Sequence, residues 1–200
     1  MNYLRGFVPW IAFAAVSTLG WQWGALAGLV LGVRLVVWDR RAGVAADALI
    51  LEQSTAVYFA ALTAIAFART DSGLHHYTAA MSMAWLALTA WATLAVRRPF
   101  TSGIARRQAP PEVWNSPVFI RLNVVLTTVW AAAFTVTAAA LGAVSAADLG
   151  DAVSVPVQIA GFVLPAVFTA RYPEKVKARA IAAATATAKP AATADPAATS

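Results

Sequence analysis

Long apolar runs separated by short charged segments limit what this chain can fold into more than any other feature. Of its 200 residues, 60% are hydrophobic and only 12% are charged. A helix needs about 20 apolar residues to cross the roughly 30 Å hydrocarbon core of a membrane. The pattern therefore predicts an all-α fold, that of a polytopic integral membrane protein with about six transmembrane helices. The expected spans cover residues 7–20, 23–38, 45–68, 77–96, 118–144 and 153–170.

The first apolar stretch, from Phe7 to Trp38, can be interpreted as one span or as two. A single helix of this length would measure about 48 Å at 1.5 Å per residue, which exceeds the thickness of the membrane core. Residues 20–24 offer a turn, because two glycines flank a segment with two tryptophans, which suit the membrane interface. We therefore expect a hairpin of two spans. The run continues past any plausible signal-peptide cleavage position, so we expect an uncleaved anchor.

Positive charge is distributed unevenly over the segments that connect the spans. With six spans, all but one of the 15 Lys and Arg residues fall on the same side of the membrane, and Arg69 alone falls on the other. Basic residues near span ends are retained on the cytoplasmic side. We therefore expect a bacterial cytoplasmic (inner) membrane protein with both termini in the cytoplasm. The same topology explains the net charge of +6 without a nucleic-acid ligand.

The last part of the chain differs in composition from the rest. From Ala178 to Ser200 it is almost wholly Ala, Thr, Lys and Pro, with too few bulky apolar side chains to offset the entropy cost of ordering. We expect a six-helix transmembrane domain over residues 1–177 and a cytoplasmic tail over residues 178–200. A helical extension is expected to about Ala184, followed by disorder.

Ionisable side chains within the expected spans are few, and such groups are costly in a membrane and often functional. Arg34 lies near the cytoplasmic end of the second span and Glu52 lies at a similar depth in the third. Because a short connection makes these spans antiparallel neighbours, we expect an Arg34–Glu52 ion pair, with Asp47 as a second partner for Arg34. Two alternatives remain open: Arg34 extends its guanidinium to the interface, or the pair serves transport or a proton relay.

The fifth expected span carries Asn123, Thr127, Trp130 and Phe134 at steps of four, three and four residues, which places them on one helical face. Such a face contacts other helices or a ligand. Asn123 and Thr127 can hydrogen-bond across helices, and Gln158 in the last span has the same capacity. The two interpretations are contacts between helices and a polar path for a ligand.

Residue patterns typical of catalysis are not found. The chain has no cysteine and only two histidines, His75 and His76, which are adjacent and therefore diverge by about 100° on a helix. No Lys lies in an expected span, so a retinal Schiff base has no anchor, and phosphate-loop and nucleophile-elbow motifs are missing. We expect no enzyme activity, no cofactor and no metal site.

The expected cytoplasmic loop over residues 97–117 combines basic and apolar residues. Pro99 can start a short helix and the pair Pro110-Pro111 can end it. An amphipathic segment of this kind is expected to lie at the membrane surface, in contact with anionic head groups or a partner. Its candidate contact residues are Arg97, Arg98, Phe100, Arg106, Arg107 and Trp114.

Within residues 85–140 the chain resembles the intracellular septation protein A family. The resemblance rests on the sequence Arg97-Arg98-Pro99-Phe100 after a span, the basic loop that follows, and Phe119 with Asn123 four residues later. The distance from Pro99 to Asn123 is longer than in that family, and the C-terminal tail is much longer. The resemblance implies a small polytopic inner-membrane protein that serves envelope synthesis and division through partner proteins.

These observations favour a non-enzymatic membrane protein that acts through protein or lipid contacts, in envelope maintenance and septation or as a subunit of a larger membrane complex. The expected partners are anionic lipid head groups and a membrane protein or further copies of the chain. The alternative is a small oligomeric transporter or channel, with a polar path near Arg34, Glu52, Asn123 and Gln158.

Overall fold

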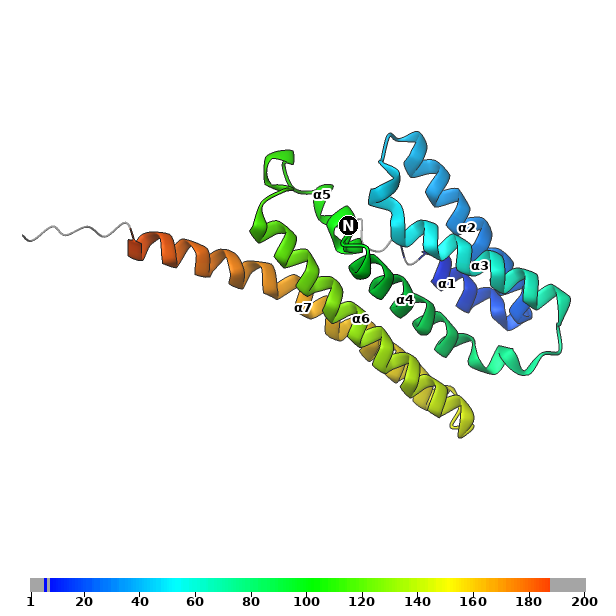
Figure 1. Ribbon diagram of the computed structural model, residues 1–200. Coiled ribbons are helices and arrows are strands. Elements are labelled where there is room, and N and C mark those ends of the chain that lie inside the picture. Colours follow the sequence, from blue (N-terminus) through cyan, green and yellow to red (C-terminus); the bar gives the residue numbers. More distant parts are fainter. Residues whose placement is uncertain (1–5, 7, 188–200) are drawn as a thin grey trace, which may run out of the picture. The chain divides into compact units, whose positions relative to one another are not determined.

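The structure, a computed structural model, describes residue 6 and residues 8–187 (Figure 1). Within these residues every regular element is a helix. The chain divides into two compact units, of which the first ends at Pro165 and the second begins at Ala166. The expectation of an all-α fold is therefore confirmed.

Five helical segments of the described chain are long and apolar enough to cross a membrane. Each corresponds to one of the expected spans from 23–38 onward, to within a few residues except at the C-terminal end of the last. The segments are Trp21–Arg41 (α2), Ala46–Ala68 (the short helix η3, Ala46–Leu49, followed by α3, Ile50–Ala68), Gly73–Ala95 (η4, Gly73–Tyr77, followed by α4, Thr78–Ala95), Pro117–Ala146 (α6) and Asp151–Val176 within α7 (Asp151–Thr187).

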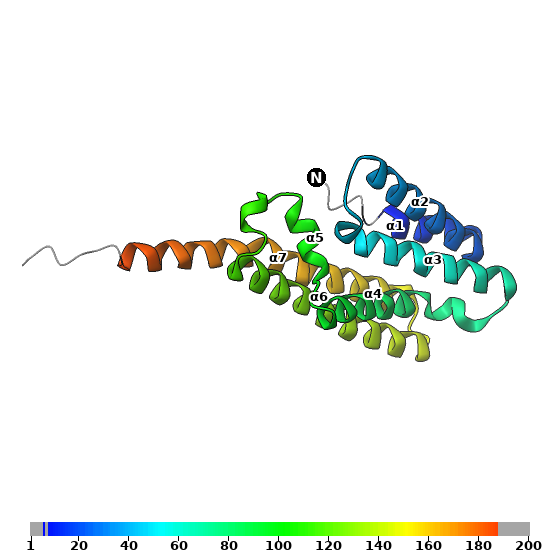
Figure 2. The same ribbon diagram turned by 45° about the horizontal axis from the view of Figure 1, so that its top comes forward.

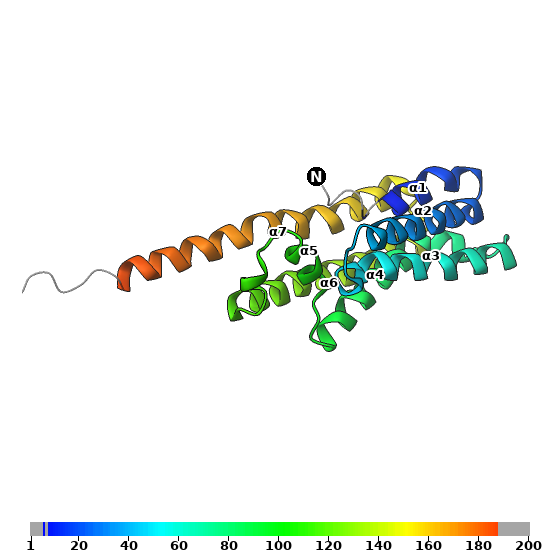
Figure 3. The same cartoon turned by 90° about the horizontal axis from the view of Figure 1, so that it is seen from above.

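The first expected span, 7–20, takes a different form. It consists of α1 (Val8–Val16) and a single turn, η2 (Ser17–Leu19), and these apolar residues are too few to cross a membrane by themselves. At about 1.5 Å per residue the segment covers about 18 Å of a core about 30 Å thick. The hairpin itself is present: Gly20 ends the segment with a φ of 133°, a conformation that favours glycine, and α2 begins at Trp21 (Figure 3).

A row of glycines lets α1 and α3 approach α2 closely. A Cβ atom added at Gly28 would lie 2.6 Å from the ring of Phe59 in α3, and one added at Gly24 would lie 2.8 Å from the carbonyl oxygen of Phe13 in α1. Gly32, one turn further, faces α3 without such crowding. Small residues spaced by four are typical of close helix packing in membranes.

A second group of helices is formed by α4 and α6, which pack along one another (Figure 1). Their shared core contains Met83 and Leu86 from α4 and Phe134 and Leu141 from α6, each at most 3% exposed. Phe162 of α7 packs against the same cluster, with its ring 5.5 Å from that of Phe134.

Polar side chains join α3 to α4. The indole Nε1 of Trp85 donates to Ser54 Oγ at 2.9 Å, and the Ser54 hydroxyl lies 2.6 Å from Thr89 Oγ1. Tyr58 and Ser82 hydroxyls lie 3.0 Å apart. Such contacts hold helices together where apolar burial alone supplies little force.

Two short helices occupy the connection between α4 and α6: α5 (Phe100–Arg106) and η5 (Pro111–Val113). α5 follows Pro99 and ends before Pro110, as expected from the positions of the prolines. It contacts η3 on one side and α6 on the other (Figure 2).

The last helix continues further than expected. α7 extends to Thr187 rather than to about Ala184, so the first ten residues of the expected tail are helical. The expectation of disorder falls on residues 188–200, which lie outside the described residues.

Candidate functional site

Polar contacts concentrate at one end of the first unit, where α2 ends, α3 begins, α4 ends and α6 begins. We call this the basic end, because Arg40, Arg41, Arg97 and Arg98 lie there. The short helix α5 lies at the same end and carries Arg106 and closes with Arg107.

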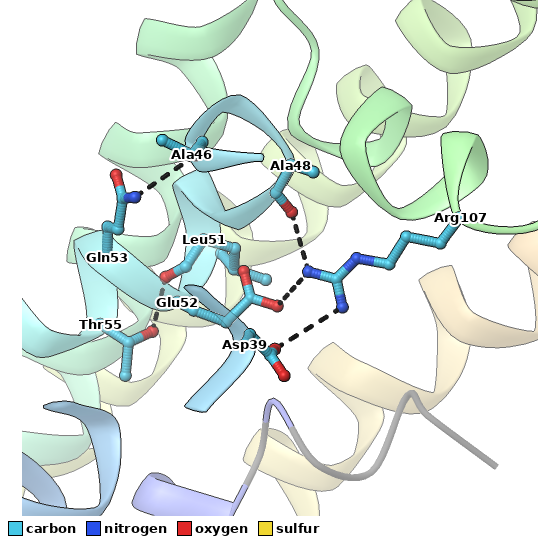
Figure 4. A network of polar contacts seen from close by, with 8 residues as sticks. All are labelled: Asp39, Ala46, Ala48, Leu51, Glu52, Gln53, Thr55 and Arg107. Carbon is cyan, nitrogen blue, oxygen red and sulfur yellow. Dashed lines mark hydrogen bonds and ion pairs between the residues drawn. The ribbon is translucent and has the colours of Figure 1, made fainter. Parts of the chain in front are cut away.

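Arg107 binds three backbone or side-chain oxygens from α2, η3 and α3 (Figure 4). Its Nη2 donates to the Ala48 carbonyl at 3.0 Å and to Glu52 Oε1 at 3.4 Å, and its Nη1 lies 3.8 Å from Asp39 Oδ2. The carboxylate side chains are 15% exposed at Asp39 and 18% at Glu52. One guanidinium therefore ties the end of α2 to the start of α3, and both carboxylates share its charge.

The expected Arg34–Glu52 ion pair is wrong, because Glu52 pairs with Arg107. Arg34 lies on the exposed face of α2, whereas Gly28 and Gly32, which face α3, mark the opposite face. The rotation of α2 about its axis, set by the glycine row, turns Arg34 away from Glu52. Asp47 is likewise not a partner of Arg34.

Arg106 binds Asp47 and Trp114 instead. Its Nη1 donates to Asp47 Oδ2 at 3.1 Å, and its guanidinium carbon lies 5.4 Å from the centre of the Trp114 ring. The Trp114 Nε1 donates to the Ala109 carbonyl at 2.9 Å, which holds the ring in place. A guanidinium over an indole face gains a cation–π interaction.

The other side of α5 is fastened to α6 through Thr101. The Thr101 hydroxyl donates to the Asn123 carbonyl at 3.0 Å and lies 2.9 Å from Thr127 Oγ1. Asn123 and Thr127 are 1% and 0% exposed, and Asn123 Nδ2 donates to the Phe119 carbonyl at 2.9 Å. Asn123 and Thr127 therefore face inward, and the Thr127 hydroxyl contacts α5, whereas the Asn123 side chain bonds only within α6.

A glycine allows α5 to sit directly on η3. A Cβ atom added at Gly103 would lie 2.8 Å from the Ala48 Cα, which is a backbone atom and cannot move aside as a side chain can. The Arg107 contact to the Ala48 carbonyl is made at the same place. The close approach of the two backbones and the hydrogen bond from Arg107 therefore hold one turn of α5 against one turn of η3.

The predicted contact surface of the loop needs a correction. Phe100 is only 6% exposed and packs with Ala90 and Ala131, so it faces the protein and not a membrane surface. Arg106 and Arg107 are engaged by carboxylates. Only Arg97 and Arg98 of the six candidates are largely exposed and without an ion pair among the described residues.

Arg97 has an unusual backbone conformation for its residue type. Its φ of 57° is left-handed, and it closes α4 with the Arg98 N–H donating to the Thr93 carbonyl at 2.8 Å. This position at a helix end usually belongs to glycine, and other residues pay about 1 kcal/mol or more there. Arg97 therefore occupies a position at which glycine would be more stable, as does Asp148 at the end of α6, where φ is 50°.

The residues of the expected polar path are not brought to one cavity. Arg34 lies on the outer face of α2, Glu52 is bound by Arg107, and Asn123 and Thr127 are buried between α5 and α6. Gln158 is half-buried on α7. Two surface grooves of the described chain, of about 910 and 430 Å³, lie along α2, and neither is lined by Glu52, Asn123 or Gln158.

Sequence reasoning missed Thr101, Gly103 and Asp39, and it missed the role of the glycine row in α2. The glycines carry a signal, because Gly20, Gly24, Gly28 and Gly32 recur every four residues. Thr101, Gly103 and Asp39 carry none, because their roles depend on contacts between distant segments.

No group of three or more His, Cys, Asp and Glu side chains in the described part of the chain could hold a metal ion. Comparison with protein-family models, with curated proteins and with solved structures finds no match for this chain.

Proposed function

We propose that this chain is a multi-pass protein of a bacterial cytoplasmic membrane that acts through contacts with an anionic partner at its basic end, rather than by catalysis. The partner is a membrane protein with an acidic surface, or the anionic lipid head groups that surround such a protein. The setting is envelope maintenance and septation, or a larger membrane complex of which the chain is a subunit. The resemblance of residues 85–140 to the septation protein A family supports this setting.

The observation that carries the proposal is the pair Arg97 and Arg98. Both are exposed, and the closure of α4 holds their backbone in one conformation. Arg97 occupies a left-handed position at which glycine would be more stable. A backbone conformation that is costly for a residue type motivates a functional hypothesis for that residue. The contacts of α5 with η3 and α6 keep the surrounding surface ordered.

The basic end faces the cytoplasm in this proposal, because basic residues near span ends are retained there. The segment α1–η2 then leads to the turn at Gly20, at the end of α2 opposite the basic end, and by its length covers only part of the membrane thickness. α2, α3, α4, α6 and α7 supply the five crossings that length and composition allow.

A transporter or channel receives less support. The residues expected to form a polar path do not line one cavity of the described chain. These residues are Arg34, Glu52, Asn123 and Gln158. Glu52, which lies further into its helix than Asp47, already has Arg107 as a partner.

The test is purification in mild detergent by a C-terminal tag, with native mass and co-purifying proteins measured together. We expect stoichiometric recovery of another membrane protein with the wild type. The double variant Arg97→Gly/Arg98→Gln should lose most of it, while its thermal stability stays equal or rises, since glycine removes the cost at position 97. The control Arg69→Gln/Arg171→Gln removes the same charge from two exposed arginines outside the helix ends that form the basic end.

Either of two results would contradict the proposal. The first is equal recovery of the partner by both double variants. The second is a homo-oligomer without partners together with a measurable ion or solute flux that Glu52→Gln abolishes, which would favour the transporter.

A further inference from the structure

The outer face of α2 carries a groove with charge at one end and apolar side chains along the rest. The space beside this face measures about 910 Å³ and is open to the outside, and among the described residues only α2 and the residue after it, Ala42, line it. Two arginines, Arg34 and Arg41, belong to its lining, with Trp38 between them. The apolar part consists of Leu29, Val30, Val33, Val37 and Ala42.

Arg34 has no ion pair among the described residues. The carboxylates closest to it along the chain are engaged by α5: Asp39 and Glu52 with Arg107, and Asp47 with Arg106. An unpaired guanidinium about 10 Å from the end of a membrane-crossing helix is costly. Something outside the described chain must offset that cost.

Extension of Arg34 toward the interface lessens this cost only in part. In a helix the Cα–Cβ bond leans toward the N-terminus. α2 ends at the basic end, so the side chain of Arg34 starts toward the middle of the membrane and must turn back. A guanidinium that turns back in this way reaches the level of Trp38, where an anion between Arg34 and Arg41 offsets its charge.

We infer that this groove binds an anionic membrane phospholipid. Its phosphate would be held between Arg34 and Arg41, which are two helical turns or about 10.5 Å apart along α2, with an acyl chain along Val30 and Val33. Trp38, 59% exposed, lies at the level between them, where an indole suits the interface. The inference does not rest on the partner proposed for Arg97 and Arg98.

The chemistry favours a lipid over a free anion. A free phosphate makes no contact with the apolar side chains that line most of the groove. A phospholipid supplies both parts in one molecule, with its phosphate between the two guanidinium groups and an acyl chain along the apolar side chains. The α2 C-terminus presents carbonyl groups, which repel anions, so the side chains alone must hold the phosphate.

The test is native mass spectrometry of the detergent-purified protein titrated with phosphatidylglycerol, and with phosphatidylcholine of the same acyl chains. We expect the wild type to bind phosphatidylglycerol at least about tenfold more tightly. Arg34→Gln/Arg41→Gln should bring the two lipids to equal affinity. The control Arg69→Gln/Arg121→Gln removes the same charge elsewhere and should keep the preference.

Further variants keep the test informative if the first one misfolds. Arg34→Lys keeps the charge and should retain a preference for phosphatidylglycerol. Unfolding temperature and elution volume are measured for every variant, and a folded Arg34→Gln single variant serves if the double variant is unfolded.

Three results would overturn the inference. One is equal affinity of the wild type for the two lipids. Another is an unchanged preference in a folded Arg34→Gln/Arg41→Gln or Arg34→Gln protein. The third is displacement of phosphatidylglycerol by millimolar inorganic phosphate, which would assign the site to a free anion.

Discussion

Two arginines at the same end of the molecule have opposite surroundings. Arg107 contacts two carboxylates and a backbone carbonyl, and its side chain is 29% exposed, whereas Arg34 lies on an open helix face with no described counter-charge. Both lie near Glu52 in depth along the bundle. The difference comes from helix rotation and from α5, and it teaches that depth in a span does not determine the partner of a charge.

Displacement of α5 from η3 is expected to have the largest effect on the contrast between Arg107 and Arg34. Replacement Gly103→Leu would push a side chain into the Ala48 backbone and displace α5, which removes the Arg107 contacts as well. We expect a loss of about 3 kcal/mol in the free energy of unfolding and faster proteolysis within residues 97–117. Unfolding in detergent and limited proteolysis measure both.

The matched control is Gly142→Leu, since a Cβ atom at Gly142 in α6 meets no neighbour within 4 Å. We expect no loss there, because leucine favours a helix more than glycine does. Equal losses of stability for the two variants would contradict the close packing of α5 on η3.

Removal of the guanidinium sharpens the comparison of the two arginines directly. Arg107→Gln removes the guanidinium from beside the largely buried carboxylates of Asp39 and Glu52. We expect a loss of about 2 kcal/mol, reduced from the cost of a fully buried pair because the side chains are partly exposed. Arg34→Gln, measured in detergent free of anionic lipid, should change stability by less than about 0.5 kcal/mol.

The relative size of the two losses of stability, for Arg107→Gln and for Arg34→Gln, tests the difference between the two arginines. A larger loss for Arg34→Gln than for Arg107→Gln would show that Arg34 has an internal partner. Chemical unfolding of both variants in the same micelle measures the order.

The hydroxyl contacts of Thr101 give the smallest effect. Thr101→Val keeps the shape of the side chain and removes the hydrogen bonds to the Asn123 carbonyl and to Thr127. We expect a loss of about 1 kcal/mol. Thr128→Val is the control, because the Thr128 hydroxyl bonds only within its own helix, to the Val124 carbonyl at 2.8 Å. Similar losses for the two would mean that the link between α5 and α6 adds nothing.

Much of the fold could be predicted, because it depends on local composition. Five of the six expected spans appear as helices with similar bounds, and the turn near Gly20 appears where two glycines allow it. The inward face with Asn123 and Thr127 followed from helical periodicity alone. Most of the site could not be predicted. Asp39 and Glu52 contact Arg107. Arg107 lies more than fifty residues from Glu52 along the chain, so no local pattern encodes this contact.

The sequence by itself determined that the chain is helical, where its five longest apolar segments lie, and at which end its positive charge gathers. These properties follow from the hydrophobic lengths of segments and from charge, which are features of the chain before it folds. The tertiary structure decided which carboxylate each arginine meets. It did so through the glycine row that sets the rotation of α2 and through Gly103, which brings α5 onto η3. Close backbone approach selects one rotation of each helix, and that rotation determines which charges are paired and which face outward.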